Sequence, residues 1–300
     1  MHDTAITRML NIRYPLIGAP MFLISNVEMV VAIGEAGGMG TFPALNYRTS
    51  EQFREAVRAI KAQTKAPFGV NLILLGNERL EADLKICLEE EVPVIITSLG
   101  NPAPVIQVAH SRGLKVFCDV TNLKHAQKCQ AAGADAVVAV ASGAGGHAGT
   151  ISPFVLVPYL QRSLDIPVIA AGGISDGRGM AAAMALGASA AYLGTRFIAS
   201  TESPAPEAYK AMILEASPED IEYTPEVSGH PANFLKSSLE AMRARGESAG
   251  GKPLRPSAWK EVWSAGHGVG LIDEVKGCGE IVNALMAEYE AIRAGLASFS

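Results

Sequence analysis

One histidine stands in an unusual run of glycines near the middle of the chain. His147 lies within residues 142–149, which read Ser-Gly-Ala-Gly-Gly-His-Ala-Gly, so few neighbouring side chains could pack against its ring. An imidazole titrates near neutral pH and can accept a proton or, when charged, stabilise a developing anion. The alternative is a histidine that only braces the loop. The scarcity of packing partners favours a catalytic role for His147.

Two further glycine motifs follow apolar runs closer to the C-terminus. The first is Ala171-Gly172-Gly173, followed by Ile174, Ser175 and Asp176, and the second is Gly194-Thr195. Paired glycines let backbone amides approach an anion closely, and a helix that starts after them adds its positive end. The alternative is that these glycines merely turn the chain. Because both motifs occur together, we expect a phosphate site, belonging to a cofactor or to a substrate.

Two more positions complete the candidate site. Ala19-Pro20-Met21 follows the first apolar run, and a methionine after a proline-fixed turn could support one face of a flat aromatic ligand. Asn71 ends a buried run, where its amide would need a partner from the protein or from a ligand. Each position taken alone could equally be structural.

Several other chemistries are disfavoured by what the sequence lacks. The apolar run before the histidine loop, residues 136–141, carries no lysine for a Schiff base, and no cysteine follows it as a nucleophile. No paired carboxylates end the fourth and seventh runs, which disfavours retaining glycosidase chemistry. The four cysteines are scattered, so we expect no disulfide framework and no metal site. They are Cys87, Cys118, Cys129 and Cys278.

Eight short apolar runs, each followed by a segment of helical composition, must position these residues. The runs are Leu16–Met21, Met39–Ala44, Phe68–Ile73, Val94–Leu99, Lys115–Val120, Ala136–Ala141, Val168–Gly172 and Ala190–Phe197. Continuous apolar runs are typical of parallel strands that are buried on both faces. The count of eight, and the absence of GxGxxG after the first run, favour a (β/α)8 TIM barrel over a doubly wound sheet. In a barrel the candidate residues would meet at the carboxyl ends of the strands.

Helix signals support this reading and mark where it stops. Ser25 with Glu28, and Thr49 with Gln52, have the spacing of capping boxes. After residue 215 the alternation ends. We expect a barrel over residues 1–215, a small, mainly helical C-terminal subdomain over 216–274 that covers the barrel mouth, and a terminal segment 275–300 in which a helix, Gly279–Leu296, packs back on the barrel.

Charge and hydropathy narrow the function classes. The 300 residues carry a formal charge of −5 without a long basic run, which disfavours a nucleic-acid or anionic-membrane surface. The first ten residues lack the apolar segment of a signal peptide, and Met180–Leu193, the most apolar stretch, is too short to cross a bilayer. We therefore expect a cytoplasmic protein that acts on a small molecule, and a homo-oligomer is compatible with the sequence.

The glycine motifs together resemble the nitronate monooxygenase family, formerly called 2-nitropropane dioxygenases. The resemblance covers most of the chain. It rests on the motifs above and on the segments Gly40-Thr41-Phe42-Pro43-Ala44-Leu45-Asn46, Asn71-Leu72 and Gly194-Thr195-Arg196-Phe197. It implies an FMN-containing barrel. By analogy, Ala19 and Met21 would contact the flavin ring near Asn71, and loop residues near Gly145 and Gly146 would line the cofactor. Ala171, Gly172 and Gly173, with Gly194 and Thr195, would hold its phosphate.

The resemblance also implies an activity. His147 would orient an anionic nitronate or take the α-proton of a nitroalkane, and the flavin, reduced by substrate and reoxidised by O2, would yield a carbonyl compound and nitrite. The nearest alternative is an FMN-dependent NAD(P)H reductase of quinones or enoyl thioesters. An alternative of another class is a flavin-free barrel that binds a phosphorylated metabolite.

Overall fold

Eight parallel strands close into a barrel, as the apolar runs predict. The computed structural model describes residues 3–245 and 261–297. The barrel strands, in the order in which they pair, are β1 (Leu16–Gly18), β2 (Met39–Pro43), β3 (Phe68–Ile73), β4 (Val94–Ser98), β5 (Lys115–Val120), β6 (Ala136–Val140), β8 (Val168–Ala171) and β9 (Ala190–Leu193). Each of the eight runs contains one strand. The eighth run is shorter as a strand than expected, because Thr195–Ile198 turns into a short helix, α9.

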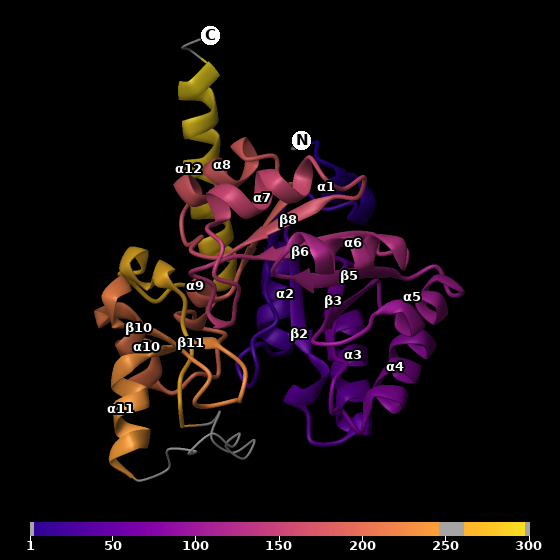
Figure 1. Cartoon of the computed structure of the whole chain (residues 1–300), viewed down its shortest axis with the longest axis horizontal. Helices are drawn as coiled ribbons and strands as arrows, with labels where there is room; N and C mark the ends of the chain where they lie inside the picture. Colours follow the sequence, from indigo (N-terminus) through magenta and orange to yellow (C-terminus); the bar gives the residue numbers. More distant parts are fainter. Residues whose placement is uncertain (1–2, 246–260, 298–300) are drawn as a thin grey trace.

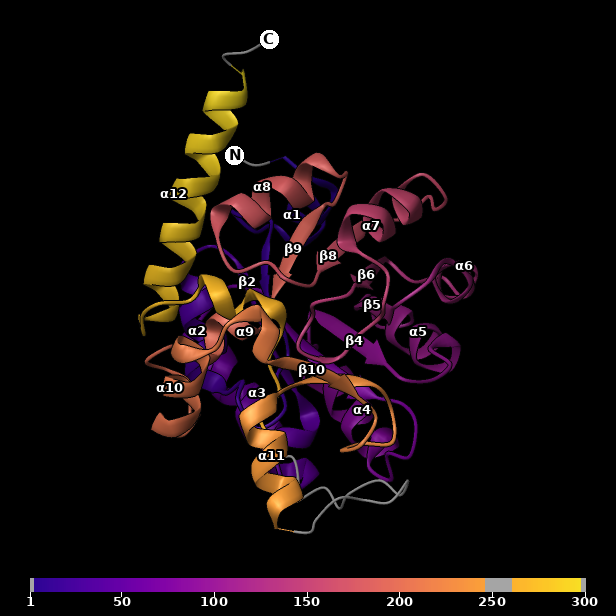
Figure 2. The same cartoon turned by 60° about the vertical axis from the view of Figure 1, so that its left-hand side comes forward.

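Helices follow the strands and surround the barrel (Figures 1 and 2). They are α2 (Val27–Glu35), α3 (Ser50–Gln63), α4 (Leu80–Glu89), α5 (Ala103–His110), α6 (Leu123–Ala131), α7 (Pro153–Gln161) and α8 (Gly177–Ala185). Thr49 caps α3 as expected, accepting a hydrogen bond from the amide of Gln52. The expected cap of α2 at Ser25 is wrong. Asn26 caps that helix, because the Ser25 hydroxyl instead accepts from the amide of Met21.

The short helix α1 (Ala5–Leu10) closes the amino-terminal end of the barrel. Its Ile6 and Leu10 belong to the same buried cluster as the interior side chains Ile17, Val94 and Phe117. Apolar packing therefore fills the barrel from this end. The carboxyl ends of the strands remain as the face on which a site can form.

The region after the barrel forms a small unit against the opposite end from α1 (Figures 1 and 2). It contains α10 (Glu207–Glu215), the 3-10 turns η2 (Pro218–Asp220) and η4 (His267–Leu271), the strands β10 (Ile221–Thr224) and β11 (Ala232–Leu235), and α11 (Lys236–Ala244). β11 pairs antiparallel with β10 and with β7 (Gly146–His147), which belongs to the histidine loop. The sequence did not indicate these strands. The expected boundaries at residues 215 and 275 remain predictions, and residues 246–260 of the expected subdomain lie outside the described residues.

A long C-terminal helix, α12 (Cys278–Ala297), packs against α8 and α2. Its start and end lie within one residue of the prediction. The Glu288 carboxylate accepts a hydrogen bond from the amide of Gly177 at 2.7 Å, so α12 also satisfies the first turn of α8. Figure 1 shows α12 running along one side of the barrel and past its edge. No helix in the described ranges is both long and apolar enough to cross a membrane.

Candidate active site

The two predicted phosphate loops follow β8 and β9, which are neighbours in the barrel. Gly172 and Gly173 have φ angles of +124° and +69°, a region that L side chains rarely adopt, so glycine is required at both positions. A Cβ atom at Gly173 would have no atom within 4 Å. The carbonyl of Ala171 accepts from the amide of Ala141, which ties the end of β8 to the start of the histidine loop. The backbone at Gly173 is therefore open to a ligand.

A buried serine beside these glycines has no partner for its hydroxyl. Ser175 is 4% exposed, and within the described part of the chain its Oγ makes no hydrogen bond. A Cβ atom at Gly268 would lie only 2.2 Å from that oxygen, so the segment passing over Ser175 must be glycine. An unpaired buried hydroxyl is costly unless a ligand satisfies it. A phosphate group at the Gly172–Gly173 loop would do so, and the residues present fit one.

The histidine loop and the phosphate loops meet through residues 264–268, a segment that the sequence indicates could reach the barrel mouth but that gave no predicted site residue. A Cβ atom at Gly145 would lie 2.9 Å from the amide nitrogen of Gly266 and 3.2 Å from the hydroxyl of Thr195. The amide of Gly266 donates to that hydroxyl at 3.0 Å, and the amide of His267 donates to the carbonyl of Gly143 at 3.0 Å. Gly145 and Thr195 therefore lie together as expected. The alternating glycines at 266 and 268 were the signal that could have identified this segment.

The loop after β1 reaches the same place. A Cβ atom at Gly194 would lie 3.6 Å from the Cβ atom of Ala19 and 3.6 Å from the sulfur of Met21. Two polar side chains hold this loop. The Ser25 hydroxyl accepts a hydrogen bond from the amide of Met21 at 2.9 Å, and the side-chain amide of Asn46 donates to the carbonyl of Met21 at 3.2 Å. Ala19 and Met21 are thus fixed against the predicted phosphate loop at Gly194.

His147 is held by the appended region and not left alone among glycines. It lies on β7 opposite Ala232 of β11, and its Nε2 atom is 3.0 Å from the hydroxyl of Ser228. That hydroxyl also lies 2.8 Å from the carbonyl of His230, to which it can only donate. Ser228 must then accept from His147, so the neutral imidazole carries its proton on Nε2. Gly146, just before it, has a φ of +66° and open space beside it.

Burial changes the titration of His147. The pKa of the imidazole lies below its ordinary value of 6.5, first because burial disfavours the charged form and second because of the charge of His230 nearby. The centroids of the two rings are 6.1 Å apart. His147 is therefore neutral at neutral pH and available as a base.

Asn71 stands apart from the phosphate loops and takes its partners from the protein. It lies on β3, 7% exposed, and its amide nitrogen donates to the Ser98 hydroxyl at 2.7 Å and to the Ile96 carbonyl at 3.2 Å. Ser98 in turn donates to the Asp119 carboxyl at 2.5 Å. This row of polar side chains crosses β3, β4 and β5. Of this row, only Asn71 was predicted as a site residue from the sequence.

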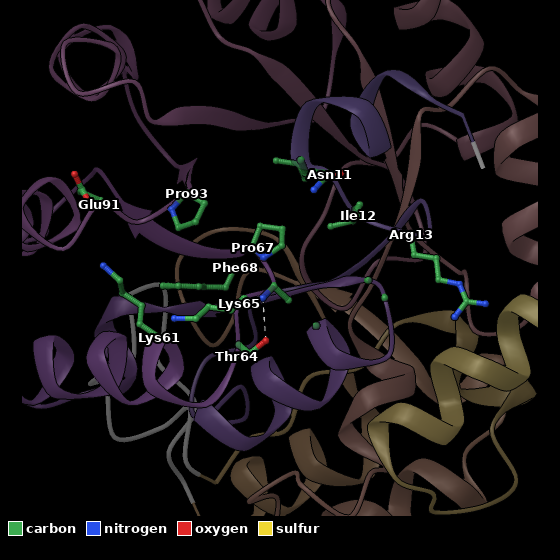
Figure 3. Close-up of a pocket in the computed structure, with 15 residues that line it drawn as sticks. Asn11, Ile12, Arg13, Lys61, Thr64, Lys65, Pro67, Phe68, Glu91 and Pro93 are labelled. Carbon is green, nitrogen blue, oxygen red and sulfur yellow. Dashed lines mark hydrogen bonds between the residues drawn. The ribbon is translucent and has the colours of Figure 1, made fainter. Parts of the chain in front are cut away.

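A separate pocket opens at the other end of the barrel. It has a volume of about 520 Å³ and is lined by the chain just before the first strands, including Ile12, Arg13, Gly37, Pro67 and Pro93 (Figure 3). It contains none of the predicted site residues. This is the amino-terminal face, where barrels do not place their chemistry. Within the described ranges, no group of three His, Cys, Asp or Glu side chains could hold a metal ion.

Comparison with known proteins gives the same family as the motifs. The model of the nitronate monooxygenase family matches residues 3–288. A nitronate monooxygenase of Paraburkholderia phytofirmans is 30% identical, covering 91% of this chain and 86% of that one. A (3aS,4S,5R,7aS)-5-hydroxy-7a-methyl-1-oxo-octahydro-1H-indene-4-carboxyl-CoA dehydrogenase of Mycobacterium tuberculosis is 32% identical, covering 82% and 71%.

Two solved structures are similar over almost their whole length. FabK from Thermotoga maritima has a TM-score of 0.88 and 35% identity, and the match covers 99% of both chains. The nitroalkane oxidase of Streptomyces ansochromogenes has a TM-score of 0.87 and 28% identity, covering 98% of this chain and all of that one. Both matches are to the barrel and the appended region together.

Proposed function

The chain belongs to the nitronate monooxygenase family of oxidoreductases, and from this premise we propose that it oxidises alkyl nitronates with O2 to carbonyl compounds and nitrite, using FMN. The observation that carries the proposal is the meeting of the histidine loop with the phosphate loops, through the contact of Gly145 with Thr195 and Gly266. One bound nucleotide could thus have its phosphate at one loop and its ring near the other.

The residues that would hold FMN come from four loops and from strand β3. Gly172, Gly173 and Ser175, with Gly194 and Thr195, would bind the phosphate through backbone amides and two hydroxyl groups. Ala19, Met21, Asn71, Gly145 and Gly146 would line the ring. When bound, the flavin supplies a group that takes electrons from the substrate and returns them to O2. The protein supplies the orientation of the substrate and the proton transfers.

His147 is the residue to which we assign those proton transfers. Its neutral imidazole, with the proton on Nε2 held by Ser228, would be the base that takes the α-proton of a nitroalkane. When it is protonated, the ring would instead orient a nitronate anion by charge. Both roles place the α-carbon of the substrate, and the nitrogen group that carries the negative charge of the nitronate, next to the histidine.

Two measurements test the proposal. The purified protein should show flavin absorbance, and the fluorescence of the released flavin should stay the same on phosphodiesterase treatment if it is FMN, whereas it rises for FAD. Anaerobic addition of an alkyl nitronate without nicotinamide should then bleach the flavin, and nitrite should appear after O2 is admitted. A colourless protein that cannot be loaded with FMN would favour the barrel that binds a phosphorylated metabolite and would refute the proposal.

A second candidate function has a specific observation in its favour. The Mycobacterium tuberculosis relative, 32% identical, is named for a coenzyme A thioester, so a related barrel handles a thioester substrate. The second candidate is therefore an FMN-dependent NAD(P)H reductase of enoyl thioesters or quinones. The same anaerobic experiment separates the two, since bleaching by NAD(P)H, with no bleaching by nitronate, supports the reductase.

A further inference from the structure

The floor of the barrel mouth carries a carboxyl group that the proposed mechanism does not use. We propose that Asp119, held by Ser98 and Asn71 and facing the barrel interior with Tyr192, is the hydrogen-bond partner of the flavin ring and meets the reduced ring as a neutral acid. The proposal concerns the residues of this chain and rests on the flavin dependence of the proposed function.

The strand pattern places these side chains in one layer. Phe117 on β5 and Ile96 on β4 point into the barrel, and side chains two residues further along a strand point the same way. Asp119 and Ser98 therefore also face inward, at the carboxyl ends of their strands. Tyr192 on β9 belongs to the interior cluster and is 8% exposed.

The hydrogen bonds of this layer run in one direction. Asn71 donates to the Ser98 oxygen, so the single proton of Ser98 goes to Oδ2 of Asp119. The second carboxyl oxygen, Oδ1, is shut off from solvent and has no hydrogen-bond partner within the described residues. The hydroxyl of Tyr192 is buried as well, which raises its pKa, and hydrogen bonding with the Thr41 side chain offsets part of this effect. Oδ1 of Asp119 is thus a buried polar atom whose hydrogen-bond partner is not among the described residues, and the Tyr192 hydroxyl lies in the same layer.

Burial without a cationic partner among the described residues makes the ionised form of Asp119 costly. Burial raises the pKa of its carboxyl to about 6, and the hydrogen bond from Ser98 offsets only part of this. The charge of Asp119 acts on Tyr192 on β9, Cys118 on β5 and Cys129 on α6, and in each case it favours the protonated form. The pKa of Cys129 is nevertheless lowered, because its hydrogen bond with Cys118 dominates. In the described ranges no lysine, arginine or histidine forms an ion pair with it.

An acid in this position would couple the flavin to pH. A neutral carboxyl can donate from Oδ1 to an electron-rich ring, whereas a carboxylate repels the negative charge that reduction adds. Ionisation of Asp119 should therefore disfavour the reduced flavin. The reduction potential should fall more steeply with pH while Asp119 titrates than it does above and below that range.

The test is a dye-linked redox titration of the FMN-loaded protein between pH 5 and pH 8.5. Asp119→Asn removes the ionisation and keeps the shape and a donor. At pH 8.5 and a fixed potential, we expect the ratio of reduced to oxidised flavin in Asp119→Asn to exceed that of the wild type by at least about tenfold. This corresponds to a reduction potential that is higher by about 30 mV for a two-electron couple. At pH 5 the two proteins should coincide. Equal potentials at both pH values would overturn the proposal.

Two further variants keep the proposal testable if Asp119→Asn does not fold. Ser98→Ala removes the donor to Oδ2, which should raise the pKa of Asp119 and move the steep part of the wild-type curve to higher pH; an unmoved curve contradicts the proposal. Tyr192→Phe keeps the packing and should shift the absorbance maximum of the bound flavin by removing a hydrogen bond to it. An identical spectrum would remove Tyr192 from the flavin site.

The control is Asp165→Asn, which removes the same charge at the other end of the barrel, just before β8, where Asp165 bonds to Gln130. Its redox curve should follow the wild type at every pH. The outcome is separable from the proposed function. A wild-type protein without flavin refutes FMN dependence, whereas a flavin-loaded wild type and Asp119→Asn with matching curves refute only the role of Asp119.

Discussion

At the scale of single residues, the site depends on how burial and hydrogen bonding set the state of His147. Its glycine neighbours alone would leave the ring in solvent with an ordinary pKa. The appended region buries it, and Ser228 fixes the proton on Nε2. A neutral, oriented imidazole is what a general base near neutral pH needs.

Replacing the imidazole should separate catalysis from cofactor binding. We expect His147→Ala to keep its flavin and to lose about 10²–10⁴-fold in turnover, the usual contribution of a general acid or base. In the wild type, kcat/KM for a nitroalkane should rise as pH increases through the lowered pKa of His147, because only the neutral ring accepts a proton, and then level off. The pH profile is measured by nitrite release under steady-state conditions.

The control for this variant is His125→Ala, at an exposed position on α6, which should leave both the rate and its pH profile unchanged. If His147→Ala turned over nitroalkane and nitronate at the wild-type rate, the histidine would have no part in the chemistry.

Ser228 should act through His147. Ser228→Ala removes the acceptor of the Nε2 proton and, with it, a hydrogen bond that stabilises the charged ring more than the neutral one. We expect the rising limb of the nitroalkane pH profile to move to lower pH and kcat to fall by about fivefold, with flavin content unchanged. Ser228→Thr, which keeps the hydroxyl, should restore the limb. A limb that stays in place in Ser228→Ala would show that the contact does not influence the base.

At the scale of elements, the site is formed where three backbone segments cross in close contact, with the Thr195 hydroxyl accepting a hydrogen bond from the amide of Gly266. The segment at residues 264–268 passes between the histidine loop and the loop after β9, and glycine is needed where they cross. Tyr209 supports this segment from α10, with its hydroxyl 2.5 Å from the carbonyl of Ser264. Such a crossing tolerates no added atoms.

Gly266→Ala tests the crossing. Its Cβ atom would lie 2.3 Å from the carbonyl oxygen of Gly143 and 2.8 Å from the amide nitrogen of Gly145, both backbone atoms, so the two loops must separate. We expect a loss of most of the bound flavin while the far-UV circular dichroism keeps the barrel signal. Flavin content is measured by the ratio of flavin to protein absorbance after gel filtration.

Gly295→Ala, near the end of α12, is the matched control, because a Cβ atom there has no atom within 4 Å. It should retain flavin at the wild-type ratio. Full flavin occupancy in Gly266→Ala would mean that the crossing is not needed for the cofactor.

At the scale of the whole molecule, the C-terminal helix supports the phosphate loop from outside the barrel. α12 packs on α8, the helix that follows Gly172, Gly173 and Ser175, and the two backbones approach closely at Gly177. A Cβ atom at Gly177 would lie 2.6 Å from the carbonyl oxygen of Leu285. The last described helix thus fixes a helix far earlier in the sequence, through a contact between Gly177 and Glu288, which are 111 residues apart.

We expect Gly177→Ala to destabilise the protein by about 1–3 kcal/mol through overpacking of this contact. A loss of that size lowers Tm by several degrees in a chain of this length. The measurement is thermal unfolding followed by circular dichroism. Gly279→Ala, whose nearest neighbour would be the Ala36 side chain at 4.0 Å, is the control and should unfold at the wild-type temperature. Equal unfolding temperatures for Gly177→Ala and the control would contradict the close packing.

The sequence by itself determined the barrel and the glycine loops to which we assign the chemistry. Eight apolar runs gave eight strands because burial on both faces requires continuous apolar side chains, which a single sequence displays directly. Gly172 and Gly173 could be placed in tight loops because only glycine adopts their backbone angles freely. These properties are local, so neighbouring residues are enough to reveal them.

Only the tertiary structure decided which partners these residues meet. Ser228 reaches His147 across 81 residues, and Gly266 reaches Thr195 across 71. The row from Asn71 to Asp119 forms because three strands align in register. β11 pairs with β10 on one side and with β7 of the histidine loop on the other. Asn26 caps α2 in place of Ser25, because the Ser25 hydroxyl accepts a hydrogen bond from the amide of Met21. Hydrogen bonds between distant segments depend on the closed fold, and no local pattern encodes them.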